Sequence, residues 1–225
     1  MRILIGAIAA ILAAAPMFAD NSTADRLRAA TDDLRDAMRA NDKGIPQDLL
    51  DKATCVVVIP NLKQGGFIVG AKYGRGFFSC RRPSGVGWSA PGAVKIEGGK
   101  FGLLIGATDT NVVMLVMNRE GMRHLTSDKF VLGGEAGAAA GPIGRTSSAE
   151  TDAEMHAEIL TYSRASGIYA GISLDGSTIH EDDDANRQLY GHAIRNAALV
   201  SDHSIHTPPE AEGFVHELDR ISERK

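Results

Sequence analysis

The sequence lacks the residue patterns that define most catalytic and cofactor-binding sites. The spacing of the residues defines no catalytic set: neither a serine, histidine and acid triad nor a pair of carboxylates can be identified from it. Ser89 is followed by Ala90 and Pro91, where a nucleophile elbow needs a second glycine. The glycine-rich run from Gly133 lacks the lysine and following hydroxyl residue of a phosphate-binding loop. We therefore expect no catalytic residue and no cofactor.

Metal-binding patterns are also absent. Four of the 7 histidines lie near the C-terminus, but the segment that holds two of them is flanked by prolines and offers no ordered set of ligands. The four are His192, His203, His206 and His216. The acids Glu181 to Asp184 lack the glycine and the spaced oxygen ligands of a calcium loop, and they suit the start of a helix instead. We expect no metal site.

Long apolar runs are scarce, and the exception is N-terminal. Ile3 to Ala15 follows Arg2 and precedes small residues and Asp20, which is the pattern of a secretory signal peptide. A membrane-spanning helix needs about 20 apolar residues, and no other segment comes close. We expect residues 1–19 to be a signal peptide, cleaved after Ala19 or, alternatively, after Ala15. The mature protein is then exported, periplasmic or extracellular, and at most peripheral to a membrane.

Cysteine is rare as well. Cys55 and Cys80 are the only two in the chain, and both lie in predicted strands. Disulfides form and persist in exported proteins, so a Cys55–Cys80 bond is the expectation, with two buried thiols as the alternative.

Charge is unevenly distributed. The net charge is −4, yet Pro60 to Lys100 holds seven cations against Glu97 alone. Residues 150 to 192 hold nine acids against two arginines. The basic segment is cut by glycines, and a glycine-opened sheet with a cationic rim suits a partner that carries phosphate, although many sheets are basic at their edges. We expect no nucleic-acid partner, because no known nucleic-acid-binding motif occurs.

Hydrophobic periodicity predicts an α+β fold in a single main domain of helices and antiparallel strands. The continuous apolar run Cys55 to Ile59 indicates a central strand, which Pro60 is expected to end. A turn is expected at Thr108 to Thr110, and a hairpin turn at Asp175 and Gly176. Helices are predicted at residues 22–40, after Pro46, at 119–125, from the acids at 181–184 through Ala197, and around 214–221. Further strands are predicted at about 66–71, 76–81, 101–107, 111–117, 135–140, 168–174 and 177–180, and residues 155–164 are ambiguous between helix and strand.

Eight short motifs occur in an order that resembles a known family. They read IP from 45, AxxVVVIP ending at 60, GGFIVGAKYGRG from 65, WSAP from 88, FGLLIG from 101, AAGPIGR from 139, YSRASGIYAGISLDG from 162 and LYG from 189. Together they resemble the SYLF domain, also called the Ysc-type actin-binding or lipid-binding domain, in an exported bacterial form. The resemblance covers roughly residues 45–196 and implies an antiparallel, strongly curved or barrel-like sheet with flanking helices.

The resemblance also implies a function. Similar eukaryotic domains bind phosphoinositide-rich membranes, often beside an SH3 or FYVE module, and some fungal members bind and bundle actin. Actin is not expected as the partner of an exported protein. The resemblance therefore implies an anionic phospholipid or a membrane surface as the partner. The helix at 22–40 matches the region thought to help membrane engagement in eukaryotic relatives, but its apolar face is rich in alanine and its charge is balanced.

We accordingly divide the chain into a signal peptide (1–19), an N-terminal amphipathic helix (20–44), a lipid-binding domain (45–200) and a linker with a C-terminal helix (201–225). We expect a non-enzymatic lipid-binding module. The alternatives are a structural envelope protein that associates into homo-oligomers and, third, a lipid hydrolase. The expected headgroup contacts are Lys63, Lys72, Tyr73, Arg75, Arg81, Arg82 and Trp88. Phe67, Phe77 and Phe78 add apolar contact wherever they are not buried in the core.

Overall fold

The computed structural model describes residues 22–39, 44–66, 69–101, 106–134, 136–141, 157–165 and 168–222. The expected signal peptide at 1–19 and Phe67 lie outside these residues. Helices are α1 (Thr23–Arg39), α2 (Gln47–Lys52), α3 (Arg119–Leu125), α5 (Asp183–Tyr190), α6 (Asn196–Ser201) and α7 (Glu212–Ile221), with the 3-10 turn η2 (Pro209–Ala211) before α7. Strands are β1 (Cys55–Gly66), β2 (Val69–Cys80), β3 (Gly92–Phe101), β4 (Gly106–Val116), β5 (Lys129–Val131), β6 (Ala138–Ala140), β7 (Ile159–Ala165), β8 (Ile168–Gly171) and β9 (Thr178–Glu181).

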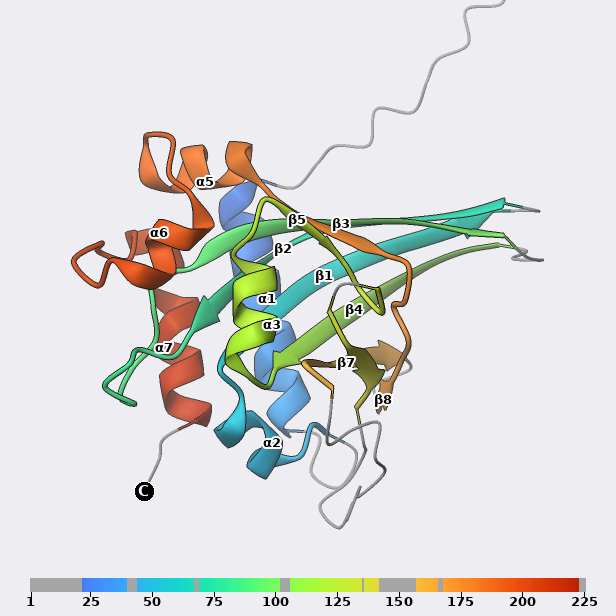
Figure 1. Cartoon of the computed structure of the whole chain (residues 1–225), viewed down its shortest axis with the longest axis horizontal. Helices are drawn as coiled ribbons and strands as arrows, with labels where there is room; N and C mark the ends of the chain where they lie inside the picture. The colour runs from blue at the N-terminus through green and yellow to red at the C-terminus, as the bar shows by residue number, and fades with distance from the viewer. Residues whose placement is uncertain are drawn as a thin grey trace, which may run out of the picture.

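The strands form one strongly curled sheet in the order β5-β9-β3-β2-β1-β4-β7-β6, with β8 paired to β7 (Figure 1). All pairs are antiparallel except β6 with β7, which is parallel. The expected α+β class with a curved sheet and flanking helices is thus confirmed. Because the central strands alternate their side chains between two buried faces, β1 is apolar at every position from Cys55 to Ile59.

One face of the sheet is covered by α1 and α7. The α1 helix forms because Leu27, Ala30, Leu34 and Ala37 lie on one stripe, and these side chains are buried in the same core cluster as Val58 and Phe77 of the strands. Its start is capped by Ser22, whose hydroxyl accepts a hydrogen bond from the amide of Asp25 at 3.1 Å. The other face packs against α3 and the segment that includes β5, around Leu125 and Phe130.

Two predicted interruptions of strands, at Pro60 and at Thr108 to Thr110, are wrong. Pro60 does not end β1, which continues to Gly66 through an irregularity where Asn61 has φ 54° and the register shifts between Ile59 and Leu62. A bulge tolerates proline because the ladder is locally interrupted there. The expected turn at Thr108 to Thr110 is the middle of a continuous β4 that pairs with β1. That stretch is polar because this part of the sheet is exposed.

Two further expectations are corrected. The turn at Asp175 and Gly176 does not make a hairpin, because β8 pairs with β7 whereas β9 pairs with β3 and β5. The helix expected from the acids at 181–184 through Ala197 is two helices, since Gly191 adopts φ 74° and ends α5. The helices expected at 119–125 and around 214–221 are confirmed as α3 and α7.

Candidate functional site

The four central strands extend beyond the helices that cover the rest of the sheet (Figure 1). We call this projecting part the arm: residues 62–66 of β1, 69–75 of β2, 96–101 of β3 and 106–110 of β4. Within the described chain, β9 pairs with β3 only from Val94 to Glu97, and β7 pairs with β4 only from Asn111 to Val116. The outer strands of the arm therefore run past the ends of their outer neighbours.

One face of the arm carries a row of polar and aromatic side chains. The strand register places Glu97, Tyr73, Lys63 and Asp109 side by side across β3, β2, β1 and β4. All four are exposed, and Tyr73 leaves 46% of its surface open. Tyr73 is thus a large aromatic side chain in solvent, next to the cation Lys63.

The opposite face of the arm carries Lys72. Gly98, Lys72, Gln64 and Thr108 form the adjacent row, and neighbouring residues of a strand point to opposite faces. The expected contacts Lys63 and Tyr73 therefore share one face, and Lys72 lies on the other. Toward the tip of the arm, the strands project past the helices of the described residues (Figure 1). At its base the arm is covered, since Leu62 and Ile96 are fully buried in a core cluster.

Arg75 lies at the base of the arm and is held by an acid. Its Nε donates to Oδ2 of Asp182 at 2.6 Å, and its Nη2 donates to Oδ1 of the same carboxylate at 3.0 Å. The two side chains are 16% and 6% exposed. Asp182 also accepts a hydrogen bond from the amide of Ala185 and so caps α5. This paired, shielded geometry fastens β2 to α5.

The remaining expected contacts lie at the far end of β2. Arg81 donates from Nε to the carbonyl of Ala53 at 3.0 Å and from Nη2 to the carbonyl of Leu50 at 3.2 Å, at the end of α2. Its guanidinium also stacks on Trp88, 4.5 Å from the ring centroid. Trp88 is 2% exposed, and its indole donates to the hydroxyl of Ser222 at 3.0 Å. Arg82 donates to the carbonyl of Trp88.

The expected contact set is therefore divided between two ends of one strand. Tyr73 and Arg81 are eight positions apart, which corresponds to about 26 Å along an extended chain at about 3.3 Å per residue. Phe77 and Phe78 lie between them and are fully buried. Lys63, Lys72 and Tyr73 belong to the arm, whereas Arg81, Arg82 and Trp88 pack near α2 and the C-terminal helix.

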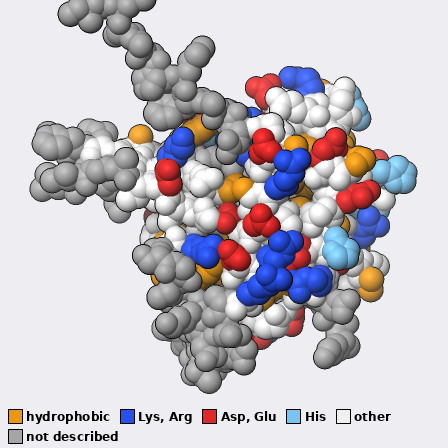
Figure 2. All heavy atoms as spheres, turned by 180° about the vertical axis from the view of Figure 1, so that it is seen from behind, with side chains coloured by type: hydrophobic (Ala, Val, Ile, Leu, Met, Phe, Trp, Pro, Cys, Tyr) orange, Lys and Arg blue, Asp and Glu red, His pale blue; other side chains and the backbone are white. Residues whose placement is uncertain are grey.

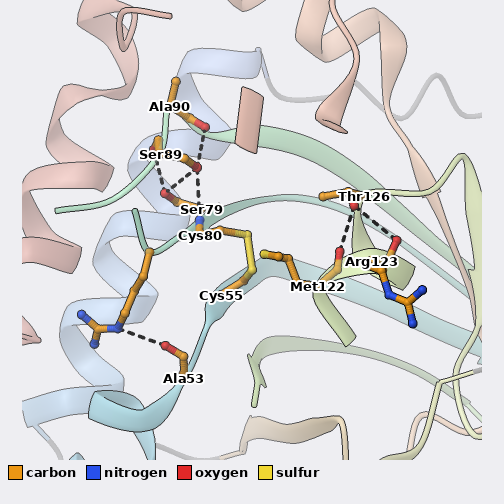
Figure 3. The surroundings of a disulfide bond; sticks show 10 residues. Ala53, Cys55, Ser79, Cys80, Ser89, Ala90, Met122, Arg123 and Thr126 are labelled. Atoms are coloured by element: carbon orange, nitrogen blue, oxygen red, sulfur yellow. Dashed lines mark hydrogen bonds between the residues drawn. A yellow bond between two sulfur atoms is a disulfide. The ribbon is translucent and has the colours of Figure 1, made fainter. Parts of the chain in front are cut away.

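The expected disulfide is confirmed (Figure 3). Cys55 and Cys80 face each other directly in the β1–β2 register, and both side chains are fully buried. Next to the bond, the Ser89 hydroxyl accepts from the amide of Cys80 at 3.1 Å and donates to the carbonyl of Ala90 at 3.0 Å. The Ser89 hydroxyl is therefore buried and structural, and it lies beside the disulfide bond that joins β1 and β2.

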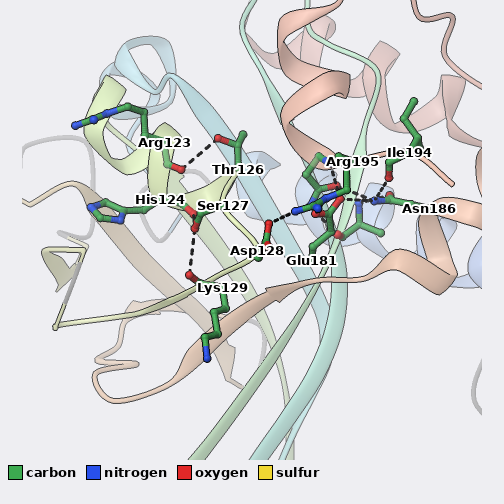
Figure 4. Close-up of polar contacts among 12 residues, drawn as sticks. Arg123, His124, Thr126, Ser127, Asp128, Lys129, Glu181, Asn186, Ile194 and Arg195 are labelled. Carbon is green, nitrogen blue, oxygen red and sulfur yellow. Dashed lines mark hydrogen bonds and ion pairs between the residues drawn. The ribbon is translucent and has the colours of Figure 1, made fainter.

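A second polar cluster joins β9, α5 and α6 (Figure 4). The buried carboxylate of Glu181 accepts from the side chain of Asn186, from the amide of Asn196 and from Nε of Arg195, the last at 2.8 Å. Burial raises the pKa of Glu181, and the hydrogen bonds oppose that shift. Arg195 also pairs with Asp128, just before β5. With its oxygens occupied, Glu181 tethers the helices to the sheet.

In the view from behind, several cationic side chains lie together near the lower centre with acidic side chains next to them, and both signs are mixed over the rest of the described surface in this view (Figure 2). On α1 and α7 they form ion pairs, such as Arg35 with Asp32 at 2.7 Å. In the described ranges, no three His, Cys, Asp or Glu side chains gather as metal ligands. The helices of those ranges include none with the length and apolarity needed to cross a membrane.

Sequence reasoning missed a buried acid on α1, on the side of the helix that faces the sheet. Asp33 is 6% exposed, and its Oδ1 accepts a hydrogen bond from the side chain of Asn111 on β4. The available signal was its position, since Asp33 precedes the buried Leu34 and follows Ala30 by three residues, on the flank of the apolar stripe. A polar residue at such a position indicates a specific partner on the facing sheet.

Comparisons with known proteins agree on one family. The family model Ysc84, described as Las17-binding protein actin regulator, matches residues 97–221. SH3 domain-containing YSC84-like protein 1 of Xenopus laevis is 33% identical over 184 residues, which cover 81% of this chain and 54% of that protein. Its counterpart in Bos taurus is 34% identical over 185 residues, covering 81% and 53%. Protein YSC84 of Saccharomyces cerevisiae is 31% identical over 181 residues, covering 79% and 38%. The chain spans about half, or less, of the length of these relatives.

Proposed function

The chain belongs to the Ysc84 family, and from that premise we propose that it is an exported, non-enzymatic module that binds anionic phospholipid headgroups at a membrane surface. The family model is described as Las17-binding protein actin regulator, and one yeast relative is named LAS seventeen-binding protein 3, so these descriptions refer to binding and regulation. For a protein outside the cytoplasm, a phospholipid surface takes the place of such a partner. Export is supported by the pattern of residues 1–19 and by the disulfide, which suits an oxidising compartment.

The observation that carries the proposal is the arm. The arm projects from the rest of the protein, which we call the body (Figure 1). One face of the arm carries the exposed Tyr73 next to Lys63 in one row. Aromatic side chains with a polar end settle at membrane interfaces, and lysine ammonium groups are attracted to anionic headgroups. Lys72 supplies a cation on the opposite face of the arm. If the arm enters the headgroup layer with one of its edges first, Lys63 and Lys72 both reach lipid phosphate groups.

Arg75, Arg81, Arg82 and Trp88 have a supporting place in this proposal. Arg75 fixes the base of the arm through Asp182. Arg81 and Trp88 stack on each other, and Arg82 bonds to the carbonyl of Trp88, near the C-terminal helix. Their substitution to alanine therefore weakens the fold as well as any headgroup contact, which makes them poor probes of binding.

Co-sedimentation with liposomes tests the proposal. Neutral phosphatidylcholine vesicles are compared with vesicles that also contain phosphatidylglycerol, at low and high salt. We expect binding to the anionic vesicles that falls with salt, and a loss of several-fold in Lys63→Gln/Lys72→Gln. The matched control Lys52→Gln/Lys129→Gln removes the same charge from exposed lysines outside the arm. Binding that ignores lipid charge, or that both double variants weaken equally, would contradict the proposal.

Self-association is the second candidate, and the edges of the arm favour it. In the described chain, β3 beyond Glu97 and β4 before Asn111 pair on their inner side only. Such strand edges are sites at which a second chain adds to a sheet. Sizing at low and high ionic strength tests this candidate. Oligomers at both ionic strengths support pairing at the strand edges, and oligomers that dissociate in salt indicate association through the opposed charges of the chain. A monomer under both conditions rejects self-association.

A further inference from the structure

Helix α1 rests on a row of polar side chains contributed by three neighbouring strands. The register pairs Asn111 of β4 with Arg164 of β7, and Arg164 with Tyr169 of β8. These three side chains meet α1 at Asp33 and Asp36. Arg164 pairs with the Asp36 carboxylate at 2.5 Å, and the Tyr169 hydroxyl donates to the backbone carbonyl of Asp33 at 2.9 Å. Beside the apolar stripe, α1 is therefore also held by a polar contact.

Asn111 meets Asp33 in a fixed orientation. Its side-chain oxygen accepts a hydrogen bond from the amide of Asn61 at 3.1 Å, in the irregular part of β1. The amide nitrogen of Asn111 is thereby turned toward α1, where it donates to Oδ1 of Asp33. One oxygen of the Asp33 carboxyl is thus satisfied by a donor that the sheet holds in place.

The other oxygen of Asp33 is buried and lacks a hydrogen-bond donor in the described chain. Oδ2 has no hydrogen-bond partner among the described residues, in a side chain that is nine-tenths buried. A buried charge that lacks donors is costly, whereas the protonated carboxyl is neutral and tolerates this site. Burial raises the pKa of Asp33 to about 7, against the lowering effect of Arg164.

We propose that Asp33 makes the docking of α1 on the sheet sensitive to pH: the helix is held while the carboxyl carries its proton and is released progressively as the proton is lost. The docked state binds one more proton than the released state between the ordinary pKa of an aspartate and about 7. The free energy that holds α1 therefore decreases as pH rises through that range and is constant above it. Release exposes the apolar stripe of Leu27, Ala30, Leu34 and Ala37.

The other charged groups around α1 do not supply this dependence. On α1 itself, Asp32 pairs with Arg35, and Asp36 pairs with Arg164. On β4 the facing group is the neutral Asn111, and burial raises the pKa of Tyr169 on β8 further above its ordinary value, so it stays neutral. Packing from α7 and α5 meets other positions, with Glu217 near Arg35 and Gln188 bonded to Thr23. Asp33 is the group in this contact whose charge changes near neutral pH.

Hydrogen exchange of the α1 segment tests the proposal in the purified whole protein. Exchange of residues 23–39, divided by the intrinsic rate at each pH, measures the opening of the helix. We expect that opening to increase roughly 20-fold between about pH 5 and about pH 6.5 in the wild type, because one proton is released on opening. Asp33→Asn keeps the shape without the charge and should remove the increase. The control Asp32→Asn makes the same change on an exposed neighbour and should keep it.

The same pH profile in the wild type and in Asp33→Asn overturns the proposal. If Asp33→Asn does not fold, the carboxyl carbon of Asp33 is titrated directly by NMR in the isotope-labelled wild type. A midpoint near 7 supports the proposal, and a midpoint near 4 overturns it. Neither measurement depends on lipid, so the result is independent of the proposed function.

Discussion

The body and the arm are two halves of the same strands, and they differ in what covers them. Phe77 and Tyr73 lie on the same face of β2, four residues apart; Phe77 is fully buried under the helices, whereas Tyr73 is 46% exposed. Both are aromatic residues with high strand propensity. The difference is therefore made by the elements packed on the sheet and not by the strand itself.

Glycine shows the same contrast. A Cβ atom at Gly76, in the body, would lie 2.0 Å from the carbonyl oxygen of Val58, whereas at Gly99, in the arm, its nearest neighbour would be 3.9 Å away. The body uses glycine at Gly76 to let strands approach closely, whereas the arm has room at Gly99. At the base of the arm the packing is still close, since a Cβ atom at Gly98 would lie 2.9 Å from the hydroxyl of Ser177. Stability accordingly resides in the body, which leaves the arm free to serve contact.

The largest effect expected from this contrast comes from the two aromatics. Phe77→Ala should destabilise the protein by about 3–5 kcal/mol, because it empties a fully buried site. Tyr73→Ala should cost less than about 1 kcal/mol, because its side chain is half in solvent. Urea denaturation of both variants measures the difference. Equal destabilisation would mean that the arm is covered in solution by something that the chain itself supplies.

The disulfide staples the body end of the same two strands. Cys55 and Cys80 are 25 positions apart, and closing a loop of this size stabilises by roughly 3 kcal/mol, mainly through the unfolded chain. Cys55→Ala/Cys80→Ala should lower stability by about that amount while leaving the arm's liposome binding intact. Thermal unfolding with and without reductant provides the measurement. Reductant should lower the melting temperature of the wild type and leave that of the double variant unchanged.

Much of the body follows from local pattern. The unbroken apolar run from Cys55 to Ile59 indicates a strand buried on both faces, and the structure confirms it. The stripe of α1 is likewise predictable, because its spacing matches the period of a helix. The Cys55–Cys80 bond was expected for another reason, since these are the two cysteines of a chain that is expected to be exported. The start of a helix was anticipated in the acids at 181–184, and α5 begins there, with Asp182 as its cap.

The arm and the polar contacts were harder to anticipate. Thr108 to Thr110 resembles a turn because a strand exposed on both faces has no apolar alternation to reveal it. The pairing of Arg75 with Asp182 joins residues 107 positions apart, and no local signal indicates it. Asp33 is similar, since its partner Asn111 is on β4. These features depend on which distant segment packs where, and a single sequence does not encode that in its periodicity.

The smallest effect comes from a matched pair of glycine substitutions that isolates packing from chemistry. Gly76→Ala should destabilise by about 1–3 kcal/mol, since the new methyl meets the backbone of Val58 and Ile59, which cannot move without shifting a central strand. Gly99→Ala should be neutral or stabilising by about 0.5 kcal/mol, because alanine limits the unfolded chain and meets no close atom. Chemical denaturation of the two variants resolves the difference. If Gly99→Ala also destabilises, the outer strand of the arm is packed against a partner, and the variant's oligomeric state then identifies whether that partner is a second copy of the chain.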